Sequence, residues 1–263
     1  MNLGLSERVA IVGGASKGLG RACAERLAHE GANLVICARD ESSLSAAAGE
    51  IAGATGREIL AVAADWSKES DIERTVEQAM STFGRVDVLI HNTGGPAPGT
   101  FFDHDDEAWR EAGELLLFSA IRLYRLIVPL MKRNEWGRIV NITSVTVKEP
   151  IDNLVLSNVY RAGIVSLAKS ISRELARDNI LINTVCPGYY LTQRMEEVLM
   201  NQAARSGRSF EEVVAGLTDD IPVGRMGDPG ELANLVAFYA SEASSNMTGT
   251  AVAADGGLLK SLI

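Results

Sequence analysis

The sequence predicts an α/β protein with a doubly wound, parallel sheet of seven strands in a single domain. Two observations carry this prediction. Short, uncharged apolar runs alternate with longer helical patterns along the chain, and no repeat, low-complexity tract or change of composition divides the 263 residues. Strands that are separated by helices of this length pair in parallel through right-handed crossovers. One doubly wound sheet can use a chain of this length.

The first unit of the chain, from Val9 to Gly20, is the one around which the rest is organised. Val9–Val12 is apolar and uncharged, which is typical of a buried strand. A glycine-rich turn follows, and then a helical pattern that Gly31 ends. This order lets a pyrophosphate approach bare backbone at a helix N-terminus, where N–H groups are unpaired. The strand and helix therefore favour a dinucleotide site over an ordinary tight turn.

The remaining elements repeat this alternation. Apolar runs predict strands at 33–37, 59–64, 86–91, 138–143, 180–186 and 251–254. Helical spacing predicts helices at 41–52, 70–83, 105–133, 154–177, 192–217 and 229–240. A glycine- and proline-rich loop covers 92–99, and Pro187-Gly188 breaks the pattern before the helical region at 192–217.

Composition excludes several classes of protein. Hydrophobic residues make up 46% of the chain and charged residues 22%, as in a globular protein, and the net charge of −9 argues against nucleic-acid binding. The three cysteines lie in apolar patterns without metal-ligand spacing, so we expect reduced thiols in the cytoplasm and no metal site. We expect no export leader. The longest apolar region, 115–131, contains Arg122 and Arg125 and predicts no membrane span.

Over nearly its whole length the chain resembles the classical short-chain dehydrogenase/reductase family, and most of all its 3-oxoacyl-(acyl carrier protein) reductases. Gly14-Ala-Ser-Lys-Gly-Leu-Gly20 is similar to the family's glycine motif, with Gly13 where threonine is usual. His91-Asn-Thr-Gly94 resembles the motif Asn-Asn-Ala-Gly with its first and third residues changed, and Asp255-Gly-Gly257 resembles the family's closing segment. The resemblance implies a Rossmann fold.

The resemblance also implies where a dinucleotide is held. Asp65 matches the aspartate that contacts adenine, and Pro187-Gly188 with Thr192 matches the segment at the nicotinamide. We therefore expect a cofactor site that comprises, together with Arg39, these residues: Gly14, Ser16, Lys17, Gly18, Leu19, Gly20, Asp65, Trp66, Asn92, Gly94, Pro187, Gly188, Tyr190 and Thr192.

The end of the second predicted strand favours NADP(H) over NAD(H). A dinucleotide without the 2′-phosphate needs a carboxylate there for the ribose hydroxyls. This chain has Arg39 at that place and Lys17 in the glycine loop, and an arginine can bind a phosphate through two hydrogen bonds. The alternative is that both cations are solvated and that Asp40 binds the ribose.

The catalytic positions depart from the family. The family has a serine, a tyrosine 13 residues later and a lysine four residues beyond; counted from Ser144, these positions hold Ser157 and Arg161. The family's asparagine falls on Leu116, counted from Trp109. Serine is harder to ionise than a phenol, and arginine stays protonated. Losing the general acid typically costs about 10²–10⁴-fold in rate. Two hydroxyls and a fixed charge can still polarise a carbonyl or bind an oxyanion.

Other candidate residues have plain structural interpretations. Tyr160 is either a relocated acid or, as we favour, a packing residue, and His91 can titrate near neutrality or make a structural hydrogen bond. The acidic loop 103–106 suggests a metal site or, equally, the start of a helix. The region 192–217 corresponds to the family's substrate lid and is also consistent with an ordinary amphipathic surface helix.

Two functions follow from the sequence. The first is an NADP(H)-dependent oxidoreductase of a small carbonyl or alcohol, in which Ser144, Ser157 and Arg161 act on the reacting oxygen and water or substrate supplies the proton. The second is a catalytically inactive relative that binds a dinucleotide or a partner for regulation or assembly. By resemblance, the helices from Asp105 and Leu154 should pack against their copies in a homodimer or homotetramer, without nucleic-acid or membrane partners.

Overall fold

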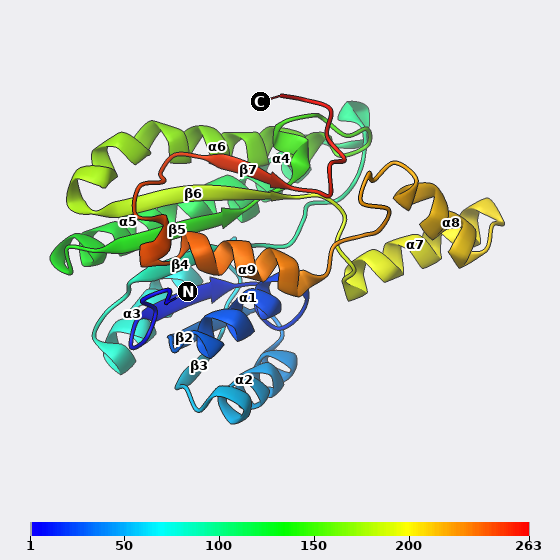
Figure 1. Cartoon of the computed structure of the whole chain (residues 1–263). Coiled ribbons are helices and arrows are strands. Elements are labelled where there is room, and N and C mark those ends of the chain that lie inside the picture. The colour runs from blue at the N-terminus through cyan, green and yellow to red at the C-terminus, as the bar shows by residue number, and fades with distance from the viewer. Residues whose placement is uncertain (1, 263) are drawn as a thin grey trace.

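Seven parallel strands form one sheet in the order β3-β2-β1-β4-β5-β6-β7 (Figure 1), which confirms the predicted α/β class. The computed structural model describes residues 2–262. The strands are β1 (Val9–Gly13), β2 (Asn33–Ala38), β3 (Ile59–Ala63), β4 (Val88–His91), β5 (Gly137–Ile142), β6 (Ile180–Pro187) and β7 (Ala251–Ala254). Every residue of β1, β4, β5 and β6 is buried, as the uncharged apolar runs predict.

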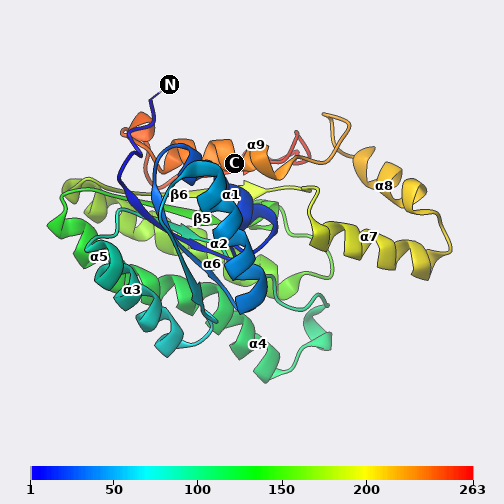
Figure 2. The same cartoon turned by 90° about the horizontal axis from the view of Figure 1, so that it is seen from below.

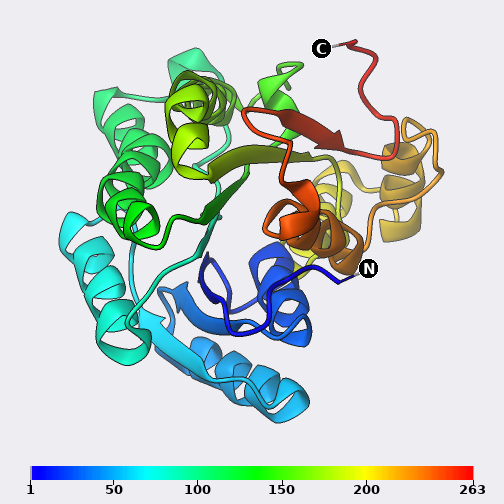
Figure 3. The same ribbon diagram turned by 60° about the vertical axis from the view of Figure 1, so that its left-hand side comes forward.

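Helices cover both faces of the sheet (Figure 3). They are α1 (Gly18–His29), α2 (Glu41–Thr55), α3 (Glu69–Phe83), α4 (Asp106–Gly113), α5 (Ser119–Arg133), α6 (Val155–Leu175), α7 (Gln193–Ser206), α8 (Phe210–Thr218) and α9 (Pro229–Tyr239). One apolar core joins α1, α2 and α9 to the sheet, and a second core joins α3, α5 and α6.

The order of the strands reverses direction between β1 and β4, and this fixes where a ligand can bind. β1 pairs with β2 on one side and with β4 on the other, so Ile11 lies beside both Val35 and Leu89. On the two sides of this point the chain crosses over towards opposite edges of the sheet. This arrangement leaves a crevice at the carboxyl ends of the strands. The glycine turn after β1 and the loop after β4 both end there.

Two predicted helices are interrupted in the structure. The helix expected at 105–133 is α4, then a π-helical turn, η2 (Glu114–Phe118), and then α5. The region expected at 192–217 is two helices, because Gly207 adopts a left-handed φ of +68° that ends α7, and Ser209 begins α8 with a capping box. The other predicted elements differ from the structure only at their ends.

The pair α7 and α8 extends away from the sheet (Figures 1 and 2). Its buried side chains, Leu199, Ala203 and Val213, form a small cluster separate from the two main cores. Within residues 2–262, no helix is long and apolar enough to cross a membrane.

Candidate active site

The glycine turn forms a close-fitting cradle of backbone. Gly14 and Gly18 have φ values of +60° and +61°, which favour glycine. A Cβ on Gly20 would lie 2.3 Å from the carbonyl oxygen of Gly14, so the helix can start this close to the turn only with glycine there. Asn92, at the end of β4, donates a hydrogen bond to the Gly13 carbonyl at 3.0 Å and braces the turn.

This cradle fits a pyrophosphate. Lys17, the N-cap of α1, makes no side-chain cap hydrogen bond, so no side chain at that position satisfies the first N–H groups of the helix. Those donors and the helix dipole favour an anion at this end of α1. Ser16 and Lys17 lie in the turn itself, whereas the side chain of Leu19 packs on the main core.

Directly after β2 lie an exposed arginine, Arg39, and an aspartate, Asp40, whose carboxylate caps α2. The Asp40 carboxylate caps α2 by accepting a hydrogen bond from the Ser43 N–H at 2.8 Å. Hydrogen bonds from Ser43 lower the pKa of Asp40, and the nearby charge of Lys17 lowers it further. Asp40 thus has a structural task, while Arg39 directly after the strand is exposed and the charge of Lys17 acts on the same segment.

Two residues that differ from the family's motifs, Gly13 and His91, both contact Trp66 under the glycine turn. A Cβ on Gly13 would lie 2.1 Å from Cζ3 of Trp66, so the glycine makes room for the indole. The Trp66 ring stacks on the His91 ring, with centroids 6.2 Å apart and planes 8° apart. The buried Trp66 side chain supports the turn from below. Asp65, beside it, is partly exposed and accepts hydrogen bonds from Ser67.

The segment after β6 closes the other side of the crevice. The Gly188 N–H donates to the Ala254 carbonyl at 3.0 Å, and a Cβ on Gly188 would lie 2.9 Å from the Asp255 Cα. Thr192 caps α7 through the Met195 N–H, and its Cγ2 lies 3.7 Å from where a Cβ on Gly18 would be. The start of the lid therefore touches the glycine turn.

Tyr190 does not face open space. Its ring packs against Gly227, where a Cβ would lie 2.6 Å from Cε1, and the residue is buried. Burial, reinforced by the charges of Glu231 and Asp255, raises the pKa of the phenol to about 12. We therefore expect any contact of this residue with a cofactor to come from its backbone.

Ser157 and Arg161 form one hydrogen-bonded unit on α6. The Arg161 Nε–H donates to the Ser157 Oγ at 3.1 Å, one helical turn away. Arg161 Nη1 donates to the carbonyls of Ile142 and Thr143 at 3.3 and 3.0 Å, and Nη2 donates to the Gly94 carbonyl at 3.5 Å. Four of the five guanidinium N–H groups are thus used, and one on Nη2 is free.

The arrangement leaves two hydroxyl protons available. Because Ser157 Oγ accepts from Arg161, its own O–H is free to donate to a bound oxygen. Ser144 Oγ accepts from the Thr146 N–H at 3.2 Å and retains its proton in the same way. Arg161 donates to the carbonyl of Thr143, next to Ser144, so the arginine links both serines to one site.

Arg161 is a buried cation, and its burial affects the pKa of the guanidinium. The residue is 8% exposed. Burial lowers the pKa of the guanidinium to about 10, and the positive charge of Arg194 lowers it as well. Below that pH the group remains charged, so it supplies a fixed positive field rather than a proton in neutral solution.

His91 and Tyr160 have structural roles. His91 Nε2 lies 3.0 Å from Ser119 Oγ, whose own proton goes to the carbonyls of Leu115 and Leu116, so Nε2 carries the histidine proton. Burial and the charge of Arg161 lower the His91 pKa to about 3, so titration near neutrality is excluded. The Tyr160 hydroxyl donates to the Trp109 carbonyl at 2.7 Å, and its ring packs on Trp109. Both contacts favour the packing role of Tyr160 over that of a relocated acid.

The structure also shows where the remaining candidates from the sequence lie. Leu116 is fully buried within the π-helical turn, so a leucine fills the position of the family's asparagine. In the acidic loop, Asp103 forms a capping box with Thr100, and Asp105 caps α4 through the Ala108 N–H at 2.9 Å. Across residues 2–262 no group of acidic, histidine and cysteine side chains could hold a metal.

Sequence reasoning missed Arg194, in the first turn of α7. Its Nη2 lies 3.1 Å from where a Cβ on Gly95 would be, and its charge acts on Arg161. The only signal in the sequence was its place two residues after Thr192.

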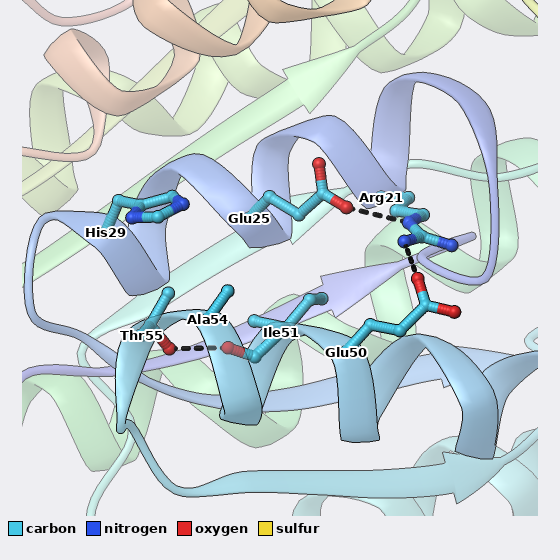
Figure 4. A pocket seen from close by; sticks show the side chains of 7 residues that line it. All are labelled: Arg21, Glu25, His29, Glu50, Ile51, Ala54 and Thr55. Atoms are coloured by element: carbon cyan, nitrogen blue, oxygen red, sulfur yellow. Dashed lines mark hydrogen bonds and ion pairs between the residues drawn. The ribbon is translucent and has the colours of Figure 1, made fainter.

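A hollow between α1 and α2 is not part of this site. Figure 4 shows that Arg21, on α1, is held by Glu25 and Glu50. His29 and Thr55 line the far end, and Thr55 Oγ1 donates to the Ile51 carbonyl at 2.7 Å. Two carboxylates face this one cation, so their combined charge is negative and the hollow does not attract a phosphate.

Comparisons with known proteins show the family to which the chain is similar. The family model described as enoyl-(acyl carrier protein) reductase matches residues 14–259. The NADPH-dependent reductase BacG of Bacillus subtilis is 34% identical over 98% of this chain and 100% of its own length. The 3-oxoacyl-[acyl-carrier-protein] reductase FabG of Escherichia coli is 32% identical over 95% and 97%. The structure of L-sorbose reductase from Gluconobacter frateurii, complexed with NADPH and L-sorbose, superposes with a TM-score of 0.97, 33% identity and full coverage of both chains.

Proposed function

This chain belongs to the classical short-chain dehydrogenase/reductase family, and from that premise we propose that it is an NADPH-dependent reductase of a carbonyl compound. In this proposal Ser157 and Arg161 replace the family's tyrosine and lysine. The observation that carries it is the hydrogen bond from the Arg161 Nε–H to Ser157 Oγ, which leaves the serine proton free at a positively charged wall.

Residues of the chain fit NADPH at each end of the crevice. The glycine turn and the start of α1 hold the pyrophosphate, and Lys17 and Arg39 hold the 2′-phosphate, while Asp40 is engaged in capping α2. The dependence of BacG on NADPH and the NADPH complex of L-sorbose reductase support this choice. When bound, NADPH supplies the hydride that reduces the carbonyl carbon.

The chain's own residues act on the carbonyl oxygen. Ser157 and Ser144 donate hydrogen bonds to it, and the buried charge of Arg161 stabilises the negative charge that develops on that oxygen. Neither serine nor arginine is a good acid near neutral pH, so the proton that completes the alcohol comes from water or from the substrate. A 3-oxoacyl thioester is the first substrate class to examine, because FabG is a relative over 95% of this chain.

The test is NADPH consumption with a panel of 3-oxoacyl thioesters and simple ketones. We expect Ser157→Ala to lower kcat by about 10²-fold or more, because it removes one donor to the developing oxyanion. Ser170→Ala is the matched control, since Ser170 is exposed on the same helix and bonds only the Ser166 carbonyl. Unchanged turnover in Ser157→Ala would remove Ser157 from the mechanism.

The double variant Ser157→Tyr, Arg161→Lys separates this proposal from an inactive relative. If the native pair is a working site, the native protein turns over and the double variant is slower. If only the double variant reduces ketones, the native chain is not a standard reductase, and the alternative of a dinucleotide-binding regulator is correct.

Two further predictions, the cytoplasmic location and the substrate lid, are supported by features of the structure. Cys23, Cys37 and Cys186 are buried free thiols, which supports a reducing, cytoplasmic compartment. The projecting pair α7 and α8 supports the lid at 192–217.

A further inference from the structure

Two guanidinium groups flank Gly94-Gly95, near the start of the loop that follows β4. Arg161, from α6, donates to the Gly94 carbonyl at 3.5 Å. Arg194, from the first turn of α7, lies against Gly95: its Nη2 and Nη1 are 3.1 and 3.3 Å from where a Cβ on that glycine would be. Glycine at 95 thus leaves the room in which the second guanidinium sits.

Neither arginine has a negative partner in the chain. Among residues 2–262 no ion pair includes Arg161 or Arg194, whereas Arg225, also near the lid, pairs with Glu231 at 2.6 Å. The acceptors around Arg161 are three neutral carbonyls and a serine hydroxyl. Burial lowers the pKa of Arg161 most, and the positive charge of Arg194 lowers it further. Arg161 is buried and Arg194 is exposed, so the cost of a buried charge without an ion-pair partner falls on Arg161, and an anion bound at Arg194 would offset it.

We propose that the substrate is a carbonyl compound that also carries a carboxylate, and that Arg194 binds this carboxylate while Ser144 and Ser157 hold the carbonyl oxygen. This inference rests on the proposed reductase function. A guanidinium matches a carboxylate with two parallel hydrogen bonds, which orients a substrate as well as attracting it. Arg194 is in the first turn of α7 and lies against Gly95, in the loop after β4. A carboxylate bound to Arg194 would therefore connect the lid with that loop.

The cofactor's pyrophosphate is the other source of negative charge. Thr192 lies close to Gly18, so the first turn of α7 passes near the phosphate cradle. Two features favour the substrate. Arg194 lies against Gly95 rather than the glycine turn, and the start of α1 already presents unpaired N–H groups to the pyrophosphate.

The experiment measures binding to the enzyme–NADP⁺ complex by calorimetry. The probes are pyruvate, levulinate and 5-oxohexanoate, each beside its neutral methyl ester, so that the distance between carbonyl and carboxylate varies. We expect at least one acid to bind roughly tenfold or more tighter than its ester. Arg194→Gln should remove that preference and leave NADPH affinity within about twofold. Arg173→Gln, an exposed arginine in the last turn of α6, should behave as the native protein.

Two results would overturn the inference while leaving the reductase function in place. One is that no acid binds more tightly than its ester. The other is that Arg194→Gln weakens NADPH binding and leaves the acid preference unchanged, which would assign Arg194 to the cofactor. Failure of the native chain to bind NADPH at all contradicts the proposed function and, with it, this inference.

Discussion

At the scale of single residues, the buried His91 is expected to make stability depend on pH. Its Nε2–H donates to Ser119, and its Nδ1 has no hydrogen-bond partner, so a second proton on the ring would be buried without an acceptor. This is why burial, with the charge of Arg161, lowers the His91 pKa to about 3 from an ordinary 6.5. Between these two values the unfolded chain binds a proton that the folded chain does not, so stability falls as the pH falls.

We predict that His91→Gln makes the protein less sensitive to acid. The native protein should lose about 2 kcal/mol more of its unfolding free energy between pH 7 and pH 5 than the variant does. Urea unfolding at both pH values measures this difference. His29→Gln, at an exposed site on α1, should follow the native protein. Equal acid sensitivity in native protein and His91→Gln would mean that His91 is not held neutral.

Site residues differed in how far the sequence could predict them. Ser144, Ser157 and Arg161 could be placed by counting along one motif, and the spacing of Ser157 and Arg161 on α6 puts those two on a common face. Arg194 could not, since its closeness to Gly95 depends on how α7 folds back over the loop after β4. For Asp40 the sequence predicted a helix from 41 but left open whether the carboxylate binds the ribose; in the structure it caps α2 through the Ser43 N–H.

At the scale of elements, β1 and the end of β3 are coupled through Gly13 and Trp66. A Cβ on Gly13 would meet the indole at 2.1 Å and the Asn92 carbonyl oxygen at 2.5 Å. We predict that Gly13→Ala and Trp66→Val each lower the free energy of unfolding. The loss in the double variant should be smaller than the sum of the two single losses by about 1–3 kcal/mol.

Denaturant unfolding of the native protein, the two single variants and the double variant measures this coupling. The control pairs Gly13→Ala with a substitution of another buried tryptophan, Trp136→Val, which directly precedes β5 and packs against Arg8 and Arg138. That pair should be additive to within about 0.5 kcal/mol. Additivity of the Gly13 and Trp66 changes would refute the idea that the glycine makes room for the indole.

The pair α7 and α8, which we propose as the lid, packs around a small cluster that is separate from the two main cores. Only three buried side chains, Leu199, Ala203 and Val213, form its own cluster. Few buried apolar contacts mean that opening costs little free energy, so we predict that amides of α7 and α8 exchange with solvent faster than those of β5 and β6. NADPH should slow exchange in the first turn of α7, because Thr192 lies near Gly18. Lid protection equal to that of β5 and β6 in the free protein would contradict a mobile lid.

The elements themselves were predictable because burial on both faces produces uninterrupted apolar strands. The interruption at Glu114–Phe118 was not, since Glu-Leu-Leu-Leu-Phe has the composition of an ordinary helix and nothing in it signals a π-turn. The division of the lid at Gly207 was open to prediction in principle, because a glycine followed by Ser-Phe-Glu-Glu is a typical helix end and start.

At the scale of the whole molecule, the helices predicted to pack against their copies expose apolar side chains. Phe118, before α5, is 45% exposed, and Val159, on α6, is 49% exposed. We predict that the native protein has a mass in solution of two or four times 28.1 kDa, and that Phe118→Glu lowers it because a buried, unpaired carboxylate is costly.

Light scattering coupled to size exclusion measures the mass. Val223→Glu is the control, because Val223 is exposed between α8 and α9 and lies outside the predicted interface. A native protein that elutes as a 28.1 kDa monomer would contradict the predicted assembly.

The central claim about the whole molecule is that it binds NADPH in order to reduce a carbonyl, and calorimetric titration with NADPH and with NADH tests this most directly. We predict micromolar binding of NADPH and binding of NADH weaker by about a hundredfold, or about 3 kcal/mol. Arg39→Glu should weaken NADPH binding by at least tenfold, since it replaces a phosphate-binding cation by a repelling charge. Equal affinities would contradict the assignment of Lys17 and Arg39 to the 2′-phosphate, and no binding of either dinucleotide would contradict the reductase itself.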